Sequence, residues 1–196
     1  MTTHAQAEEN LKIIRSLMER GTLYRTISVP SAFMIGSFSL LGGFIQMRKL
    51  IFNWENDYLL SFLLLWIIVF VLIGVFNFYW LVIRNRGEIA HYPRIKKAIT
   101  CMLPSGLAGL LFTWSSFQSG ALLSMISVWM IFYGLGLLST MVFAPRSILF
   151  LGWSFLLSGF VTFILKQTLE PFSSSLIMIT FGFYHLIYAF FTRGRN

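Results

Sequence analysis

Residues that could carry chemistry are few in this chain and lie far apart. The carboxylates Glu55 and Asp57 are close in sequence, but no base or further ligand accompanies them. The sequence contains no His-Glu-x-x-His, no Gly-x-Ser-x-Gly and no phosphate-binding glycine-rich loop. The single Cys101 excludes an intrachain disulfide and any multi-cysteine metal site. We therefore expect no catalytic residue, no metal site and no cofactor, and a protein that is not an enzyme.

Composition places the chain in a membrane. Hydrophobic residues make up 57% of it and charged residues 11%, whereas a soluble domain carries about 25% charged residues. A soluble particle of 22.6 kDa would keep a large water-exposed surface that so apolar a chain could not cover. A surface that faces lipid removes this difficulty.

Six apolar stretches are long enough to span a bilayer, which takes roughly 20 residues of helix. They cover about 27–47, 58–83, 98–115, 120–143, 147–165 and 172–192. The sequence thus predicts an all-α polytopic membrane helix bundle over residues 26–196. Residues 1–25 form a separate N-terminal region.

The basic residues predict the orientation of this bundle. If the N-terminus is cytoplasmic, all 15 Lys and Arg except Arg48, Lys49 and Lys166 lie on the cytoplasmic side. Such a bias favours a cytoplasmic N-terminus and, with six spans, a cytoplasmic C-terminus. We expect a multi-pass protein of the bacterial plasma (inner) membrane. The net charge of +8 then serves topology and lipid contact, and we expect no nucleic-acid partner.

The loop 84–97 is the most polar stretch of the chain. Its basic residues are candidate contacts for anionic lipid on the cytoplasmic side: Arg84, Arg86, Arg94, Lys96 and Lys97. His91 and Glu88 lie in the same loop, and an enzyme at the inner face would use them. That alternative ranks third among the functions considered.

Residues 6–25 are typical of an amphipathic helix. Leu11, Ile14 and Leu17 recur at helical spacing, while Lys12 and Glu19 lie mostly on the other side. One interpretation is an interfacial helix lying on the inner leaflet. The other is a docking helix for a cytoplasmic protein partner.

Asn77 and His185 lie within the predicted spans at similar depth from the inner face, and Tyr184 is next to His185; these three are the candidate polar intramembrane residues. Polar side chains in a bilayer usually face the bundle and bond across helices. We expect His185 to bond to a neighbouring helix, with Asn77 as one candidate partner. The alternative is a polar lining for a ligand or permeant.

The chain carries an internal repeat. Residues 35–45 align without gaps to 151–161, with Gly36 at Gly152 and Gly43 at Gly159. Residues 76–81 resemble 181–186, which places His185 at the position of Trp80, and 132–135 give a third Phe-Tyr-x-Leu element. Pro30, Pro104 and Pro145 are expected near the starts of the odd spans. The repeat predicts three helical hairpins.

Small residues line one face of several spans, which permits close helix packing within the bundle or, alternatively, a homo-oligomer interface.

Two resemblances follow from these segments. Residues 9–20 and 24–28, with Pro104-Ser105-Gly106 and Gly182-Phe183-Tyr184-His185, resemble bacterial six-helix integral membrane proteins of unknown function. The hairpin pattern is also similar, more loosely and through its glycine spacing, to HdeD-like hairpin-repeat membrane proteins. The first resemblance implies six spans and no known activity or site.

Taken together, these observations favour a non-enzymatic membrane scaffold, or the membrane partner of a cytoplasmic protein engaged through residues 6–25. The alternative function is a small channel or transporter with a polar path near Asn77, Tyr184 and His185.

Overall fold

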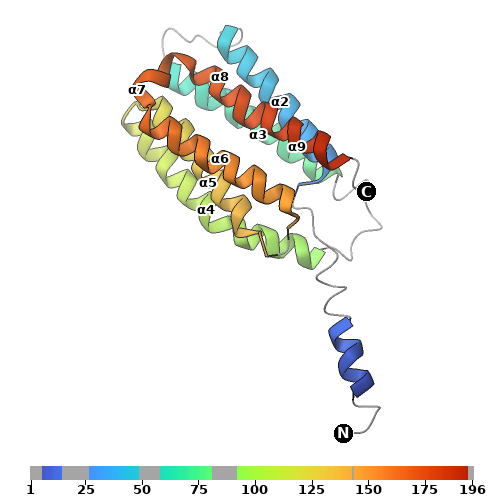
Figure 1. Ribbon diagram of the computed structural model, residues 1–196. Helices are drawn as coiled ribbons and strands as arrows, with labels where there is room; N and C mark the ends of the chain where they lie inside the picture. Colours follow the sequence, from blue (N-terminus) through green and yellow to red (C-terminus); the bar gives the residue numbers. More distant parts are fainter. Residues whose placement is uncertain (1–5, 15–26, 49–57, 81–91, 143, 194–196) are drawn as a thin grey trace.

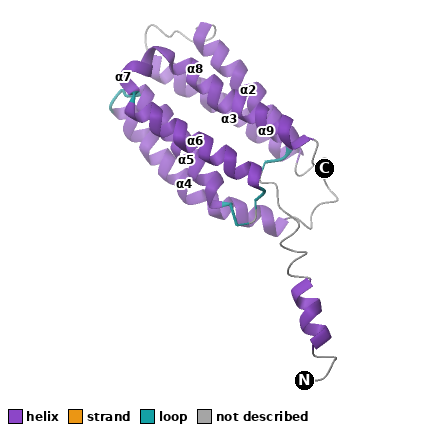
Figure 2. Cartoon of the chain, in the orientation of Figure 1, coloured by secondary structure: helices purple, strands orange, loops and turns teal. Residues whose placement is uncertain are grey.

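The structure is a computed structural model, and it describes residues 6–14, 27–48, 58–80, 92–142 and 144–193 of the chain. These residues are almost entirely helical and contain no strand (Figure 2). A helix over residues 6–14 lies apart from the remaining helices, which pack side by side as a bundle (Figure 1). The expected all-α class is therefore confirmed for the described part of the chain.

Ten helical elements make up the described part of the bundle. They are α2 (Val29–Arg48), α3 (Tyr58–Phe78), α4 (Tyr92–Gln118), α5 (Leu122–Ser139), α6 (Arg146–Ile164), α7 (Lys166–Leu169), η3 (Glu170–Phe172), α8 (Ser173–Ile177), η4 (Met178–Phe183) and α9 (Tyr184–Arg193). The last five follow one another with little interruption and together take the place of the expected span 172–192.

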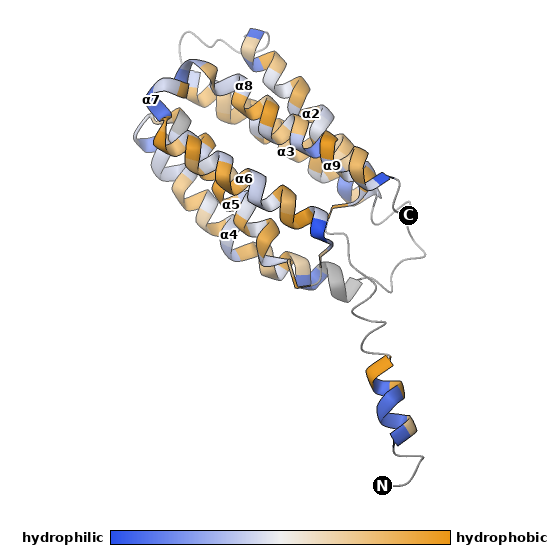
Figure 3. Ribbon diagram, in the orientation of Figure 1, coloured by the Kyte–Doolittle hydropathy of each residue, from blue (hydrophilic) through white to orange (hydrophobic). Residues whose placement is uncertain are grey.

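Five described helical stretches are long and apolar enough to cross a membrane. They are Val29–Arg48, Tyr58–Phe78, Lys96–Gln118, Arg146–Ile164 and Lys166–Arg193. The fourth expected span, 120–143, corresponds to α5, in which the stretch Ser124–Ser139 is a shorter apolar helix. Hydrophobic residues run along the helices of the bundle (Figure 3), and many of them are exposed, such as Leu110 at 68% and Phe190 at 78%. An apolar exterior of this extent suggests a membrane-embedded protein.

The third expected span differs most from the structure. Sequence reasoning placed a short helix at 98–115 with Pro104 near its start, but α4 has 27 residues and carries Pro104 in its interior. Neighbouring hydroxyls bond to carbonyls around this proline: Ser105 Oγ donates to Met102 O at 2.8 Å and Ser139 Oγ to Cys101 O at 3.0 Å. Such hydroxyls help a spanning helix to tolerate an interior proline.

The helices form two groups, which Figure 1 shows as two layers. In one group α2 packs on α3 and on the α8–η4–α9 stretch, and in the other α5 packs between α4 and α6. The helices alternate in direction, so that the starts of α2, α4 and α6 and the ends of α3 and α9 lie at one end of the bundle (Figure 1).

Each group contains one close crossing, and both crossings rely on glycine. A Cβ on Gly36 of α2 would lie 2.9 Å from Gly182 O, and a Cβ on Gly134 of α5 would lie 2.8 Å from Gly152 O of α6. Side chains larger than hydrogen would push these backbones apart. The expected close packing of the first and fifth spans is therefore confirmed at Gly36 and Gly152.

The two crossings correspond residue by residue, in a register that sequence comparison missed. Gly36 contacts Gly182 and Leu186, as Gly152 contacts Gly134 and Leu138. This correspondence pairs Gly134 with Gly182, whereas aligning the Phe-Tyr-x-Leu elements pairs Gly134 with His185. For residues 132–135, the register of the two glycine contacts therefore differs by three residues from the alignment of the Phe-Tyr-x-Leu elements.

Candidate functional site

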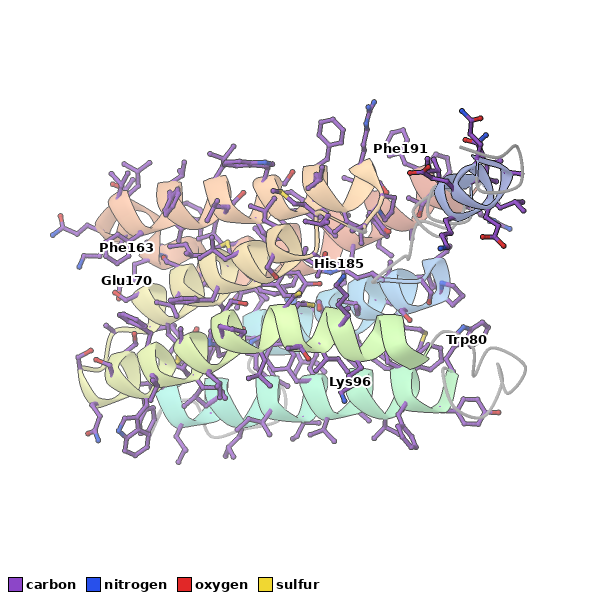
Figure 4. All side chains as sticks on the ribbon, turned by 90° about the horizontal axis from the view of Figure 1, so that it is seen from below. Trp80, Lys96, Phe163, Glu170, His185 and Phe191 are labelled. Atoms are coloured by element: carbon purple, nitrogen blue, oxygen red, sulfur yellow. The ribbon has the colours of Figure 1, made fainter. Side chains whose placement is uncertain are left out.

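His185 of α9 is fully buried and bonds through both ring nitrogens. Its Nε2 lies 2.7 Å from Tyr133 Oη of α5, and its Nδ1 lies 3.0 Å from Phe181 O one turn earlier. The side chain lies inside the bundle, whereas Phe191 of the same helix is on the outer surface (Figure 4). His185 therefore joins the two helix groups.

The hydrogen bonds define the tautomer of this imidazole. A carbonyl oxygen can only accept, so Nδ1 carries a proton and donates it to Phe181 O. In the neutral ring Nε2 then accepts from the hydroxyl of Tyr133. Each polar group at this position is satisfied by protein, which avoids the cost of an unpaired polar atom in an apolar interior.

A widened helical turn leads directly to His185. The η4 segment is π-helical from Met178 to Phe183, and α9 resumes at Tyr184. Single π-turns of this kind are rare and often occur at functional sites. Here Gly182 of this segment contacts α2. The ring of Phe181 packs against the ring of Tyr133, with 5.6 Å between the two ring centroids.

Aromatic rings surround the His185–Tyr133 pair. Phe155 of α6 lies with its ring centroid 5.4 Å from that of His185 and 4.8 Å from that of Tyr133. Phe155 is itself fully buried. The imidazole is thus enclosed by apolar rings and has no described polar contacts beyond Tyr133 and Phe181.

The other two predicted polar residues do not join His185. Tyr184 Oη lies 2.8 Å from Ser158 Oγ of α6, on a different side of the helix. Asn77 Nδ2 donates to Ile73 O of its own helix at 2.9 Å. The expectation that Asn77 is a partner of His185 was wrong, because the amide of Asn77 bonds within α3 and Tyr133 supplies the partner.

Sequence reasoning missed a second buried polar cluster, between α2 and α3. Gln46 is 1% exposed; its Oε1 accepts from Trp66 Nε1 at 3.1 Å, and its Nε2 donates to Tyr58 Oη at 3.3 Å. Gln46 lies near the end of its helix, where a polar residue is ordinarily taken as facing the membrane surface. One feature of the sequence could have indicated this cluster: the next span contains Trp66 and Tyr58, two aromatic residues that can form hydrogen bonds.

The remaining candidates lie at the periphery. Lys96 and Lys97 are exposed near the start of α4, and Arg94 lies in the first turn of that helix. Arg84, Arg86, Glu88 and His91 lie outside the described residues. Every described residue of the N-terminal helix, 6–14, is exposed, including Leu11 at 64%.

This arrangement can hold helices together. Among the described residues no group of three His, Cys, Asp or Glu could hold a metal ion. No protein-family model, curated protein or solved structure matches the chain.

Proposed function

We propose that this chain is a six-span integral membrane protein with both ends in the cytoplasm. The five long apolar stretches and α5 supply six helices of alternating direction, and the 18 residues of α5 reach about 27 Å at 1.5 Å each. In this arrangement Lys96, Arg146 and Arg193 lie at one end of the bundle, as the positive-inside bias requires for the cytoplasmic face. A bacterial plasma membrane suits this pattern.

The internal repeat is part of the same proposal. Three hairpins, α2–α3, α4–α5 and α6–α9, would enter from the cytoplasm. The matching crossings Gly36–Gly182 and Gly152–Gly134 support it, because each joins the first helix of one hairpin to the second helix of another.

Within that fold we propose a non-enzymatic role, as a membrane scaffold or the membrane partner of a cytoplasmic protein. The observation that carries this proposal is that two buried polar side chains of the core, His185 and Gln46, are used in contacts between helices. His185 bonds to Tyr133 and Gln46 bonds to Trp66, so these groups tie the bundle together. A channel or transporter near Asn77, Tyr184 and His185 has less support, because those three residues bond in three separate places.

The N-terminal region is the proposed attachment point for the partner. Leu11 and Ile14 are exposed on a helix that lies apart from the bundle (Figure 1). Apolar residues on an amphipathic helix are recognised either by a hydrophobic groove on a protein or by the leaflet surface.

Site-specific photo-crosslinking in cells separates these occupants. A photoreactive amino acid at Leu11 should give adducts with one cytoplasmic protein, while the same residue at Glu8 should give far fewer. Deleting residues 6–25 should abolish the adduct and leave the thermal unfolding of the bundle unchanged. Only lipid adducts at Leu11 would contradict the partner role, and unfolding of the deleted protein would contradict an external helix.

A further inference from the structure

A long apolar groove separates α3 from α4. It consists of two cavities, of about 560 Å³ and 300 Å³, which share Phe70, Leu110 and Trp129. The larger cavity reaches Met102 and Gly136, and the smaller reaches Leu63 and Phe117. Along α4 the groove extends from Met102 to Phe117, about 22 Å at 1.5 Å per residue. Ligand cavities in proteins have volumes of about 300–1,000 Å³.

The sequence explains why this crossing stays open while two others close. In the proposed repeat, Gly106 with Leu110 and Leu111 stands where α2 has Gly36 with Leu40 and Leu41. The facing residue on α3 is then Asn77, at the position of Gly182. A glycine on each helix permits the closed crossings, whereas Asn77 carries a side chain that bonds to Ile73 O. This explanation rests on the proposed repeat, but the groove does not.

One buried hydroxyl in the groove has no partner. Ser39 of α2 lines the larger cavity, is 1% exposed, and its Oγ forms no hydrogen bond with any described residue. The other hydroxyls of that lining are engaged, Ser105 with Met102 O and Tyr133 with His185. A free hydroxyl at the wall of an apolar cavity fits a ligand with one hydrogen-bonding group and a long apolar remainder.

The depth of Ser39 restricts the nature of that ligand. Ser39 lies ten residues from Val29 and nine from Arg48, so it is about 14–15 Å from either end of α2. That position is near the midplane of a hydrocarbon core about 30 Å thick. A charged headgroup is costly there, so a phospholipid headgroup does not suit Ser39. An uncharged hydroxyl or carbonyl does.

We propose that the α3–α4 groove binds a neutral long-chain lipid. Its uncharged hydroxyl or carbonyl head bonds to Ser39, and its chain lies along Phe70 and Leu110 toward Phe117. The ligand enters sideways from the bilayer, because Leu103, Leu107 and Leu110 of the lining are also exposed on the outside of α4. A long-chain alcohol and an isoprenoid quinone share this chemistry.

Two glycines allow a matched test of the site. A Cβ at Gly106, in the lining of the larger cavity, would meet nothing within 4 Å, and the same holds for Gly74 of α3, which is not part of either lining. Gly106→Phe therefore adds a bulky ring at the lining of the larger cavity, on a Cβ that meets no neighbouring atom. Gly74→Phe adds the same side chain outside it.

The experiment uses the full chain in phosphatidylcholine vesicles containing hexadecanol with a mid-chain diazirine. Photo-adducts are mapped by mass spectrometry. We expect them to concentrate on groove residues such as Phe70 and Leu110, rather than on the exposed Phe150 and Phe190. Gly106→Phe should reduce groove adducts severalfold, and Gly74→Phe should leave them unchanged.

A competition experiment then distinguishes a hydroxyl from a carbonyl as the polar head of the bound lipid. Unlabelled hexadecanol and decylubiquinone are each added as competitors, and the one that displaces the probe at lower concentration has the preferred head. Ser39→Ala should weaken displacement about fivefold, the loss expected for one hydrogen bond, without lowering thermal stability.

Adducts spread evenly over the lipid-facing surface, or groove adducts unaffected by Gly106→Phe, would overturn the proposal. The proposal would also be overturned if a diazirine phosphatidylcholine labelled the groove as strongly as the hexadecanol probe and Ser39→Ala had no effect. Crosslinks between two copies of the chain through the groove would overturn it as well.

Discussion

Tyr133 and His185 are 52 residues apart in sequence, and their side chains meet in a hydrogen bond of 2.7 Å at the centre of the bundle. Tyr133 belongs to the group formed by α4, α5 and α6, and His185 belongs to the group around α2. The bond therefore spans the junction between the groups. Its surroundings are aromatic rings, so breaking it leaves a polar atom with no water to replace the partner.

The first prediction concerns this pair. His185→Gln should be more stable than His185→Leu, because the Gln side-chain amide can still accept from the Tyr133 hydroxyl. We expect a difference of about 1 kcal/mol, the usual size of a hydrogen bond between membrane helices. Thermal unfolding of the purified protein measures it. Tyr133→Phe should abolish the advantage of Gln over Leu, and an advantage that survives in the Tyr133→Phe background would show that Gln is stabilised by another contact.

The second prediction concerns Gln46 and Trp66. Gln46→Leu should destabilise the protein by about 1–3 kcal/mol, because the indole N–H is then buried without an acceptor. Trp66→Phe removes that donor, so the combined variant should lose less than the two single changes added together. Denaturant unfolding of all four proteins gives the coupling. Strict additivity would mean that the 3.1 Å contact contributes nothing.

The third prediction tests the close crossing of α5 and α6. Gly134→Ala would place a Cβ 2.8 Å from both Gly152 O and Leu156 N, and these backbone atoms cannot move without separating the helices. We expect a loss of about 1–3 kcal/mol, as for other overpacked sites.

Gly74→Ala is the control for that change. Its added methyl meets nothing within 4 Å, so the helix gains up to about 1 kcal/mol of intrinsic propensity. Both variants are compared by thermal unfolding in the same detergent. Equal stability of the two would contradict a tight contact at Gly134.

The fourth prediction concerns topology. Reporter fusions after Arg94 and Arg195 should report the cytoplasm, and a fusion after Gln118 should report the outside. The physical reason is the retention of basic segments on the cytoplasmic side. Gln118 ends α4 without a charged residue nearby, so it tests the third span most directly. A cytoplasmic signal there would remove α4 as a crossing helix.

The membrane class could be read from the sequence because it depends on composition summed over long windows. Each expected span overlaps a described helical stretch, and 147–165 closely matches Arg146–Ile164. Boundaries were less certain: Pro104 suggested a helix start, but in the structure α4 continues through it. A proline at an interior position and one at a helix start look alike in a sequence, since only the neighbouring carbonyls and hydroxyls distinguish them.

The polar contacts were decided by the tertiary structure. The sequence indicated that His185 needs a partner, because a lone imidazole in an apolar span is costly. It could not identify Tyr133, whose hydroxyl is brought to His185 by the way α5 packs against the other helix group. Gln46 was missed for the same reason, since its burial comes from Trp66 and Tyr58 on the next helix.

The sequence by itself determined that this chain forms long apolar helices with a largely apolar exterior, because hydrophobicity and helical length are local properties. Only the tertiary structure decided which helices meet closely and which leave a groove. Gly36 and Gly182 come together, whereas Gly106 of α4 borders an open cavity. Glycine permits close approach but does not choose the neighbour, and that choice depends on how all the helices share the available space.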